Sequence, residues 1–414
     1  MGRISQSKNG DHRKRADRRK RVNQRPIMTD VLFQITEKEL ETGMRGYPVG
    51  YCTTSTVDPQ KGLSYVGHPI AELASWRPEE VIYLLQFGKE GSKKEIADFF
   101  AELQKRMTLK PETIAAIEKL PRSGHPMKLF SAAMLILGMM EGQGDYREDE
   151  LSAVAKIPHL AAVVINYHAG WGKTPPSKPE LGYMENFTQL LKIPKGDVKK
   201  LFPSFKLFNV LHFDHGGGNL STFVGKAVAS GLEDMYGSMC SALCALAGPR
   251  HGRANQDCLE FVREVHKEVG DNAKPQDVEA LIRRRLKENK LVFGFGHAVL
   301  RVEDPRATVM FDYLQKEYPQ HPLVKIALLL RTEGSKVLKE NPKISDPYPN
   351  VDAISGTMLA AAGFDYPEYF TILFGLARTV GIARQIVYER LEARGGKGTP
   401  IIRPKYIYSG PSSN

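Results

Sequence analysis

The sequence predicts a mostly α-helical protein built from many stacked helices. Over most of its 414 residues, apolar side chains recur three and four positions apart, which is the period of an amphipathic helix. Prolines, with acidic residues just after them, mark where several of these segments begin. Strand-like sequence is confined mainly to residues 50–66, which is too little for a major sheet. We therefore expect an all-α fold.

The elements follow in order along the chain. In residues 50–66, β-branched and aromatic residues lie between turn residues such as Asp58 and Pro59, which favours short strands. A helix then opens at Pro78, because proline suits the first helical position and acids follow it in the first turn. Further helices are expected at residues 93–106, 125–140, 157–167, 218–246, 275–289, 305–317, 322–341 and 367 to about 394.

The chain is long enough for two domains, because single hydrophobic cores stop growing at about 250–300 residues. A charged amphipathic stretch from Asp257 to Lys290 indicates the start of a smaller lobe, and the apolar helix after Pro367 indicates a return to the main core. We predict a large domain of residues 28–253 and 359–414, a small domain of residues 254–358, and a separate tail of residues 1–27.

The net charge of +11 is concentrated in that tail. Residues 1–27 hold ten Lys or Arg and two Asp, a net charge of +8, which leaves +3 for the rest of the chain. With almost no apolar residues, the tail cannot bury enough surface to fold alone, and we expect it to be disordered. A solvated extension, or an upstream start before Met28, is favoured over a role in binding nucleic acid or an anionic surface. Nucleic acid is not expected as a partner.

The remaining composition favours the cytoplasm. No apolar run approaches the roughly 20 residues that span a bilayer, and the N-terminus lacks a secretory signal, so no membrane association is expected. The mitochondrial matrix is the second choice, because a transit peptide would carry few acids and an apolar face. The four cysteines form no CxxC pair, which indicates a reducing compartment and no structural zinc. Cys240 and Cys244, four apart on one helix face, are expected to be buried thiols.

Three histidines lie in separate glycine-bearing segments, and an aspartate follows downstream. His215 stands in HFDHGGGN, His251 in AGPRHGRANQ, His297 in FGFGHAVLRVEDPR and Asp352 in PNVDAISG. Glycine beside a histidine lets backbone or ligand approach the imidazole closely, and imidazoles titrate near neutral pH. We interpret the four groups as an active site assembled from distant segments near the junction between the lobes.

His215 allows three interpretations. Together with His212 it forms HxxH, a weak metal signal because neither HExxH nor an obvious further ligand set is present. The glycines that follow would also let a helix N-terminus and the imidazole meet an anion, or the histidine is simply satisfied in a turn. No metal is expected. The GxG before His297 lacks the later glycine of a dinucleotide fingerprint, which argues against a Rossmann fold.

Arginines supply the positive charge that an anionic ligand would need. Arg378 lies on an otherwise apolar helix, where an unpaired charge is costly, so it either pairs with an internal acid or binds a carboxylate ligand. Arg301 and Arg306 follow His297 and favour the ligand. Arg403, near the C-terminus, is either a solvated charge or an arm that reaches another subunit.

These segments together resemble the citrate synthase family, particularly its eukaryotic-like form, which also occurs in bacteria. The match runs from GMRGYPVGYCTTSTVDPQKGLSYVGHPI, through the motifs above and FGLARTVG, to RPKYI, and covers nearly everything after residue 30. The resemblance implies an all-α homodimer whose subunits each close a large and a small domain over the substrates. It implies condensation of oxaloacetate with acetyl-CoA and hydrolysis of the citryl thioester. CoA would be a cosubstrate, with no metal, nicotinamide or permanently bound cofactor.

The resemblance also implies a chemical role for each group. Asp352 would remove a methyl proton from acetyl-CoA, while His251 hydrogen-bonds the thioester oxygen. Ser221 would orient His251. His297 would polarise the oxaloacetate carbonyl and protonate the new alkoxide.

The implied binding residues are basic groups and a glycine-rich loop. The residues that match the binding site for the oxaloacetate dianion are His215, Ser221, Arg306, Arg378 and, from the partner subunit, Arg403. The residues that match the CoA site are Arg45 and Arg301 at the phosphates, and Val292, Gly294 and Gly296 in the loop near the adenine.

The chain departs from the family pattern at three positions. Asn166 stands where the eukaryotic pattern has an arginine that helps bind CoA, so phosphate recognition is expected to differ. Arg250 and Arg253 flank His251 where uncharged residues are usual, and facing solvent is favoured over contact with CoA phosphates.

The nearest enzymatic alternative is 2-methylcitrate synthase, which uses propionyl-CoA on the same scaffold. One methylene is worth only about 1–3 kcal/mol of discrimination in an apolar pocket, so shared motifs do not separate the two. The eukaryotic-like pattern favours acetyl-CoA. A basic binding protein with a scaffolding body and a metalloenzyme are the alternatives from other classes.

Overall fold

The computed structural model describes residues 31–194 and 196–410. It confirms the all-α fold class, because helices dominate these residues and their only sheet is small. Contacts divide the chain into a unit that ends at Gly50 and a unit that begins at Tyr51. The described part of the first unit holds a short 3-10 helix, η1 (Glu37–Glu41), and mostly exposed side chains. The basic tail of residues 1–27 lies outside the described residues.

The second unit opens with the expected strands, β1 (Ser55–Asp58), β2 (Gly62–Tyr65) and β3 (His68–Pro69), which pair antiparallel in that order. Asp58 closes the turn between β1 and β2, because its Oδ1 accepts the backbone N–H groups of Gln60 and Lys61 at 2.8 and 2.9 Å. The register pairs Ser55 with Tyr65, so both side chains lie on the same face of the hairpin.

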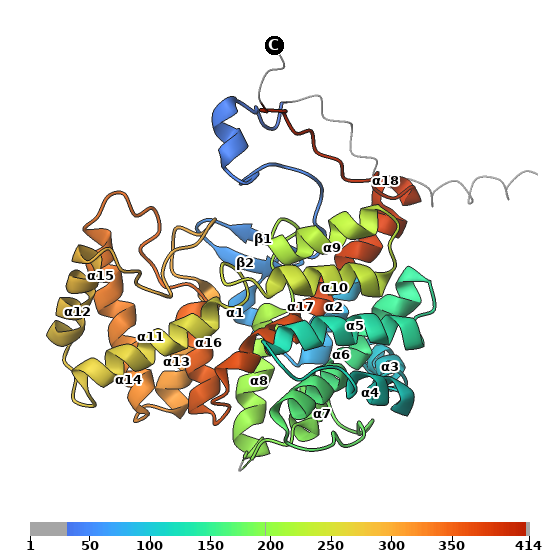
Figure 1. Cartoon of the computed structure of the whole chain (residues 1–414), viewed down its shortest axis with the longest axis horizontal. Coiled ribbons are helices and arrows are strands. Elements are labelled where there is room, and N and C mark those ends of the chain that lie inside the picture. The colour runs from blue at the N-terminus through green and yellow to red at the C-terminus, as the bar shows by residue number, and fades with distance from the viewer. Residues whose placement is uncertain (1–30, 195, 411–414) are drawn as a thin grey trace, which may run out of the picture. The chain divides into compact units, whose positions relative to one another are not determined.

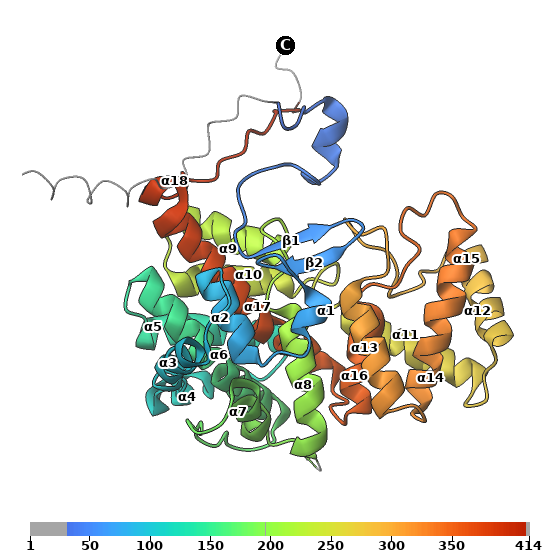
Figure 2. The same ribbon diagram turned by 180° about the vertical axis from the view of Figure 1, so that it is seen from behind.

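A main group of helices follows the sheet, and Figures 1 and 2 show it from opposite sides. Its members are α1 (Ile70–Leu73), α2 (Pro78–Phe87), α3 (Lys93–Gln104), α4 (Pro111–Ile117), α5 (Pro126–Glu141), α6 (Tyr146–Ala169), α7 (Tyr183–Leu190), α8 (Val198–His212), α9 (Leu220–Ser230) and α10 (Met235–Leu246). Their apolar faces form the larger of two buried clusters of the described residues. The helix expected at Pro78 is confirmed, with proline at the first helical position.

A second group of helices gathers to one side in both views (Figures 1 and 2). It contains α11 (Ala254–Val269), α12 (Pro275–Lys287), α13 (Pro305–Glu317), α14 (Pro322–Leu329), the π-helix η2 (Leu330–Gly334), α15 (Ser335–Lys339) and α16 (Asp352–Ala361). A separate apolar cluster, with members from Phe261 to Val337, forms a small core here. This cluster falls inside residues 254–358, the range predicted for the small domain. The domain boundaries themselves stay a prediction.

The chain then returns through the main core. A 3-10 turn, η3 (Pro367–Tyr369), leads into α17 (Phe370–Val387), which continues as the π-helix η4 (Tyr388–Glu392) and ends in α18 (Ala393–Gly396). Nearly all side chains of α17 are buried. This helix corrects the expectation that no stretch is apolar enough to cross a membrane: residues 367–396 pass that test by length and composition. Because 94% of their most apolar window is buried in the protein, the helix is accounted for as a core element.

Three further expectations need correction. The single helix expected at residues 218–246 is two, because Leu232 has a positive φ of 68° and Asp234 caps the start of α10 through Gly237 N–H at 2.7 Å. The helix expected at residues 157–167 begins earlier, at Tyr146. Cys240 is buried as expected, but Cys244 is exposed.

Candidate active site

His215 lies in the loop between α8 and α9, where Gly216 adopts a positive φ of 73°. Its imidazole faces His297, with ring centroids 5.4 Å apart. No described residue hydrogen-bonds the His215 ring. Burial, and then the positive charges of Arg306 and Arg378, hold the pKa of His215 well below its usual value. His215 is therefore a neutral group that is free to contact a ligand.

His251 lies between α10 and α11, against the start of α9. Its Nε2 is 3.0 Å from Ser221 Oγ and accepts the Ser221 backbone N–H at 3.3 Å. Because a backbone N–H can only donate, its contact with Nε2 favours a neutral ring that carries its proton on Nδ1. Burial, and then the charge of Arg378, lower the pKa of His251 to about 4. His251 thus presents Nδ1–H as a donor at neutral pH, while Ser221 contacts its other ring nitrogen.

In His297 the proton lies on Nε2, whereas in His251 it lies on Nδ1. Its Nδ1 accepts the backbone N–H groups of Val299 and Leu300, each at 3.0 Å. Nδ1 therefore carries no proton, and the neutral ring holds its proton on Nε2. Burial, and then the charge of Arg306, lower the pKa of His297, which favours this neutral form. The backbone of its own loop thus fixes His297 as an Nε2–H donor.

Asp352 is the first residue of α16, and a short backbone pairing holds it in place. Asn350 N–H donates to Gly294 O and Asn350 Nδ2 donates to Gly296 O, both at 2.9 Å. Asn350 Oδ1 in turn accepts the Asp352 N–H at 3.0 Å. Gly294 lies so close to Ala353 that a Cβ on it would come within 2.8 Å. The glycine loop expected near the adenine is therefore attached directly to the segment that carries Asp352.

The Asp352 carboxyl group is poised to exchange a proton. Burial raises its pKa to about 7, although the positive charges of Arg306 and Arg378 act in the opposite direction. No described residue donates a hydrogen bond to its carboxylate. A carboxylate with a pKa near neutrality and no internal partner is suited to act as a general base.

Arg306 and Arg378 differ in their partners. Arg306 forms a buried ion pair with Asp304, with Nη2 and Oδ2 2.7 Å apart. Arg378, by contrast, donates from Nε to His212 O at 3.0 Å and lies 4.8 Å from the centre of the Phe374 ring. No described acid forms an ion pair with Arg378, and burial lowers its pKa to about 10. The sequence left open whether Arg378 pairs with an internal acid or binds a carboxylate ligand. The structure favours the carboxylate ligand.

The other expected binding residues, Arg45, Arg301, Arg403 and Val292, are exposed or partly exposed. Arg45 belongs to the first unit and is exposed. Arg301 is exposed and bonds carbonyls of its own loop, including Leu300 O at 2.6 Å. Arg403 is exposed as well, and Val292 is partly exposed at the start of its loop.

The departures from the family pattern have different structural outcomes. Asn166 is fully buried, and its amide bonds Thr174 Oγ1, Leu190 O and the Lys192 N–H, each at 2.9 Å. No donor of Asn166 is left for a phosphate. Arg250 is exposed, whereas Arg253 is partly buried at the start of α11.

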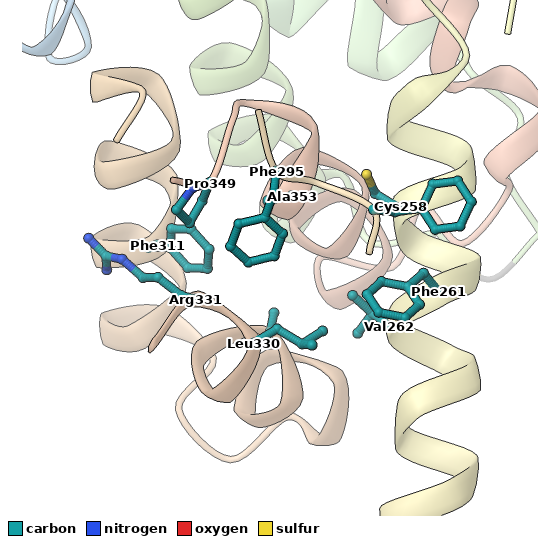
Figure 3. Close-up of a pocket in the computed structure, with 11 residues that line it drawn as sticks. Cys258, Phe261, Val262, Phe295, Phe311, Leu330, Arg331, Pro349 and Ala353 are labelled. Carbon is teal, nitrogen blue, oxygen red and sulfur yellow. The ribbon is translucent and has the colours of Figure 1, made fainter. Parts of the chain in front are cut away.

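A cavity lies beside Phe295, as Figure 3 shows. Phe295 and Ala353 line it, together with the α11 side chains Cys258 and Phe261 and with Leu330 of the π-helix. Neither Asp352 nor any of the three histidines lines it. The cavity therefore lies beside the candidate site and holds none of its polar groups. In the described residues, no group of three or more His, Cys, Asp or Glu side chains has the arrangement of a metal site.

Sequence reasoning missed the residues that hold the site in place. Asp304 neutralises Arg306, Asn350 ties the Asp352 segment to the glycine loop, and Asn219 accepts the Ser221 hydroxyl at 2.9 Å. Asp214, beside His215, is fully buried and accepts several side-chain donors. One signal in the sequence could have found them: each of these polar residues lies within two positions of a predicted site residue.

The site combines complementary chemical properties. A base with a pKa near 7 would take a proton from carbon beside a carbonyl group, and a fixed N–H donor would stabilise the enolate oxygen. A second fixed N–H donor would polarise the carbonyl that the enolate attacks, and an unpaired arginine would bind a carboxylate on the same molecule. This arrangement suits carbon–carbon bond formation between an acyl compound and an anionic keto acid.

Comparisons with known proteins agree with that chemistry. The family model described as "Citrate synthase, C-terminal domain" matches residues 43–405. A citrate synthase of Citrus maxima, named mitochondrial, is 34% identical and covers 91% of this chain and 83% of the relative. Citrate synthase 4 of Arabidopsis thaliana, also named mitochondrial, is 33% identical over the same shares.

Solved structures resemble the chain over most of its length. The citrate synthase of Thermotoga maritima aligns with a TM-score of 0.76 and 27% identity, over 90% of this chain and 96% of the other. The citrate synthase of the archaeon Thermoplasma acidophilum aligns with a TM-score of 0.78 and 25% identity, over 90% and 97%. The latter was solved as a ternary complex with carboxymethyl coenzyme A and oxaloacetate.

Proposed function

The chain belongs to the citrate synthase family, whose members are acyltransferases, and on that basis we propose that it condenses acetyl-CoA with oxaloacetate to give citrate and CoA. One observation carries the proposal. Asp352, with a pKa of about 7, accompanies two neutral histidines whose protons are fixed on known nitrogens. Enolisation of a thioester requires both a base and a donor to the oxygen, because the methyl proton is only weakly acidic.

In the first step, Asp352 takes a proton from the acetyl methyl group. His251 donates its Nδ1–H to the thioester oxygen, where negative charge develops as the proton leaves. Ser221 holds the other ring nitrogen, which keeps the proton on Nδ1. A neutral donor suits this step, because it stabilises the enolate without first having to lose a proton.

In the second step, the enolate carbon attacks the keto carbon of oxaloacetate. His297 donates its Nε2–H to the keto oxygen and supplies the proton that the alkoxide takes up. His215, Arg306 and Arg378 bind the carboxylates, and Arg378 can accept one without first breaking an ion pair. Water then cleaves the citryl thioester, which releases CoA.

We expect the active unit to be a homodimer in which Arg403 of one subunit reaches the oxaloacetate of the other. Arg45 and Arg301 would bind the phosphates of CoA, which acts as a cosubstrate, and Val292, Gly294 and Gly296 would adjoin the adenine. Arg301 would have to release the carbonyls of its own loop to do so. The named complex of the Thermoplasma acidophilum relative, with a CoA derivative and oxaloacetate, supports these substrates.

The cytoplasm stays our expected compartment, on the composition of residues 1–27. The plant relatives are named mitochondrial, so import into isolated mitochondria is the measurement that would reverse this expectation.

Release of free thiol tests the proposed function. Purified protein is given acetyl-CoA or propionyl-CoA, each with and without oxaloacetate, and the thiol is measured over time. We expect release that requires oxaloacetate and is faster with acetyl-CoA. The Asp352→Asn variant is the control for catalysis by this site. Faster release with propionyl-CoA would replace the proposal with 2-methylcitrate synthesis, and no release that depends on oxaloacetate would refute both.

A further inference from the structure

The loop that carries His215 is held by a buried network that the mechanism above does not use. Asp214 is fully buried beside His215, and its carboxylate accepts hydrogen bonds from Thr54 Oγ1, from Ser55 Oγ at 2.7 Å and from Gln385 Nε2 at 2.9 Å. Thr54 and Ser55 lie at the start of the hairpin and Gln385 lies in α17, and each of these donors is more than 150 residues from Asp214 in the chain. The Asp214 carboxylate is therefore held both by the start of the hairpin and by α17.

Ser55 has a second contact that its neighbour Thr54 lacks. Its hydroxyl accepts the backbone N–H of Gly216 at 2.6 Å while it donates its only proton to Asp214. The hydroxyl therefore bridges the residues on both sides of His215. Its contact with Gly216 fixes the backbone at the position where φ turns positive.

The rest of the hairpin supports the same point. Tyr65 is the cross-strand partner of Ser55, and its hydroxyl accepts the Asp214 backbone N–H at 3.1 Å. From α17, Gly381 donates its N–H to Phe213 O at 3.0 Å and leaves no room for a side chain against Asp214. The backbone of residues 213–216 is thus held by side chains of the hairpin and by the backbone of α17.

His215 itself is the free member of this arrangement, since its ring makes no hydrogen bond with a described residue and faces His297. We propose that Ser55 is a positioning residue, which sets the His215 imidazole for the keto dicarboxylate through its hydrogen bonds to Asp214 and Gly216. This inference rests on the proposed function. It extends that function, because part of the affinity for oxaloacetate would then depend on the β1–β2 hairpin. The hairpin would act through His215, without a side chain of its own in contact with oxaloacetate.

The test first compares substitutions of three consecutive residues, Thr54, Ser55 and Thr56. Ser55→Ala removes both links, whereas Thr54→Val removes a donor to the same carboxylate but keeps the link to Gly216. Thr56→Ala changes an exposed neighbour on the opposite face and serves as the control. The KM for oxaloacetate, the KM for acetyl-CoA and kcat are measured for each variant, together with oxaloacetate binding by calorimetry without acyl-CoA and the thermal unfolding midpoint.

We expect Ser55→Ala to raise the oxaloacetate KM and Kd about tenfold, as loss of a hydrogen bond to a charged group does, with the acetyl-CoA KM within about twofold. Ser55→Thr keeps the hydroxyl and should restore most of the affinity. Thr54→Val should lower the unfolding midpoint about as much as Ser55→Ala while it changes the oxaloacetate KM less than about threefold. Equal effects of Ser55→Ala and Thr54→Val on that KM would overturn the proposal, because a general loss of packing would then explain both.

A double substitution gives an independent check. In a His215→Ala background, the loss of Ser55 should add little to the oxaloacetate KM, because no imidazole remains to be positioned. Additive effects would contradict the inference. Failure of the wild-type protein to release thiol with oxaloacetate would refute the proposed function instead, so the two failures are distinguishable.

Discussion

Substitution of Asp352 by asparagine separates the catalytic group from the stability of the fold. Asparagine has nearly the same shape but no ionisable group, so it cannot take the methyl proton. A positioned base contributes about 10²- to 10⁴-fold to a rate, and we expect turnover to fall by that factor. In the wild type, kcat/KM for acetyl-CoA should rise with pH and level off above about pH 7, where Asp352 is ionised.

The same substitution should stabilise the protein at high pH. Burial raises the pKa of Asp352 from 3.8 to about 7, a shift on the order of 4 kcal/mol at 1.36 kcal/mol per unit. Between these two values the folded state holds a proton that the unfolded state has lost, so wild-type stability falls as the pH rises. From pH 5 to pH 8 this loss is about 2–3 kcal/mol, and the asparagine variant should avoid it.

Two assays read these effects on the same protein preparations. Thiol release measures turnover, and urea unfolding at pH 5 and pH 8 measures stability, at one fixed protein concentration. Asp312→Asn changes an exposed aspartate on α13 and should leave both quantities near wild type. Near-wild-type turnover of Asp352→Asn would refute its role as the base. A stability difference from wild type that is the same at both pH values would refute the raised pKa.

Two further predictions test the subunit arrangement and the tail. Arg403→Ala should raise the oxaloacetate KM about tenfold or more, since it removes a charged hydrogen bond, and mixing it with Asp352→Asn protein should restore part of the thiol release if sites are shared between subunits. Purified mixed dimers without any recovery would show that each site is complete in one subunit. Deletion of residues 1–27 should leave kcat and both KM values unchanged, and should remove any salt-sensitive binding to nucleic acid. A loss of thiol release on this deletion would mean that the tail serves catalysis.

Local signals in the sequence were sufficient to predict the helices, but not all of their first and last residues. Proline at the first helical position and a regular apolar period gave the start of α2 and both ends of α13 correctly. The break between α9 and α10 was missed, because Leu232 is an ordinary residue whose positive φ depends on its tertiary surroundings. The exposure of Cys244 was missed for a related reason, since helical spacing gives a shared face and leaves open what covers it.

The candidate site, too, could be predicted only in part from the sequence. Histidine and aspartate in glycine-bearing segments indicated the reacting groups, and the family motifs implied their roles. The sequence did not indicate which ring nitrogen of His251 and of His297 carries the proton. They depend on which backbone N–H groups meet His251 and His297, and those contacts join α9 to the loop before α11 and close the turn after His297.

The sequence by itself determined the residue types and their order: the helical period, the glycines beside three histidines, and the arginine on an apolar helix. The tertiary structure alone decided the state of each group. Burial raises the pKa of Asp352 and lowers those of the histidines, Asp304 pairs with Arg306, and Arg378 forms no ion pair with a described acid. The physical reason is that solvation and charge pairing depend on distance in space, and neighbours in space come from segments far apart in the chain.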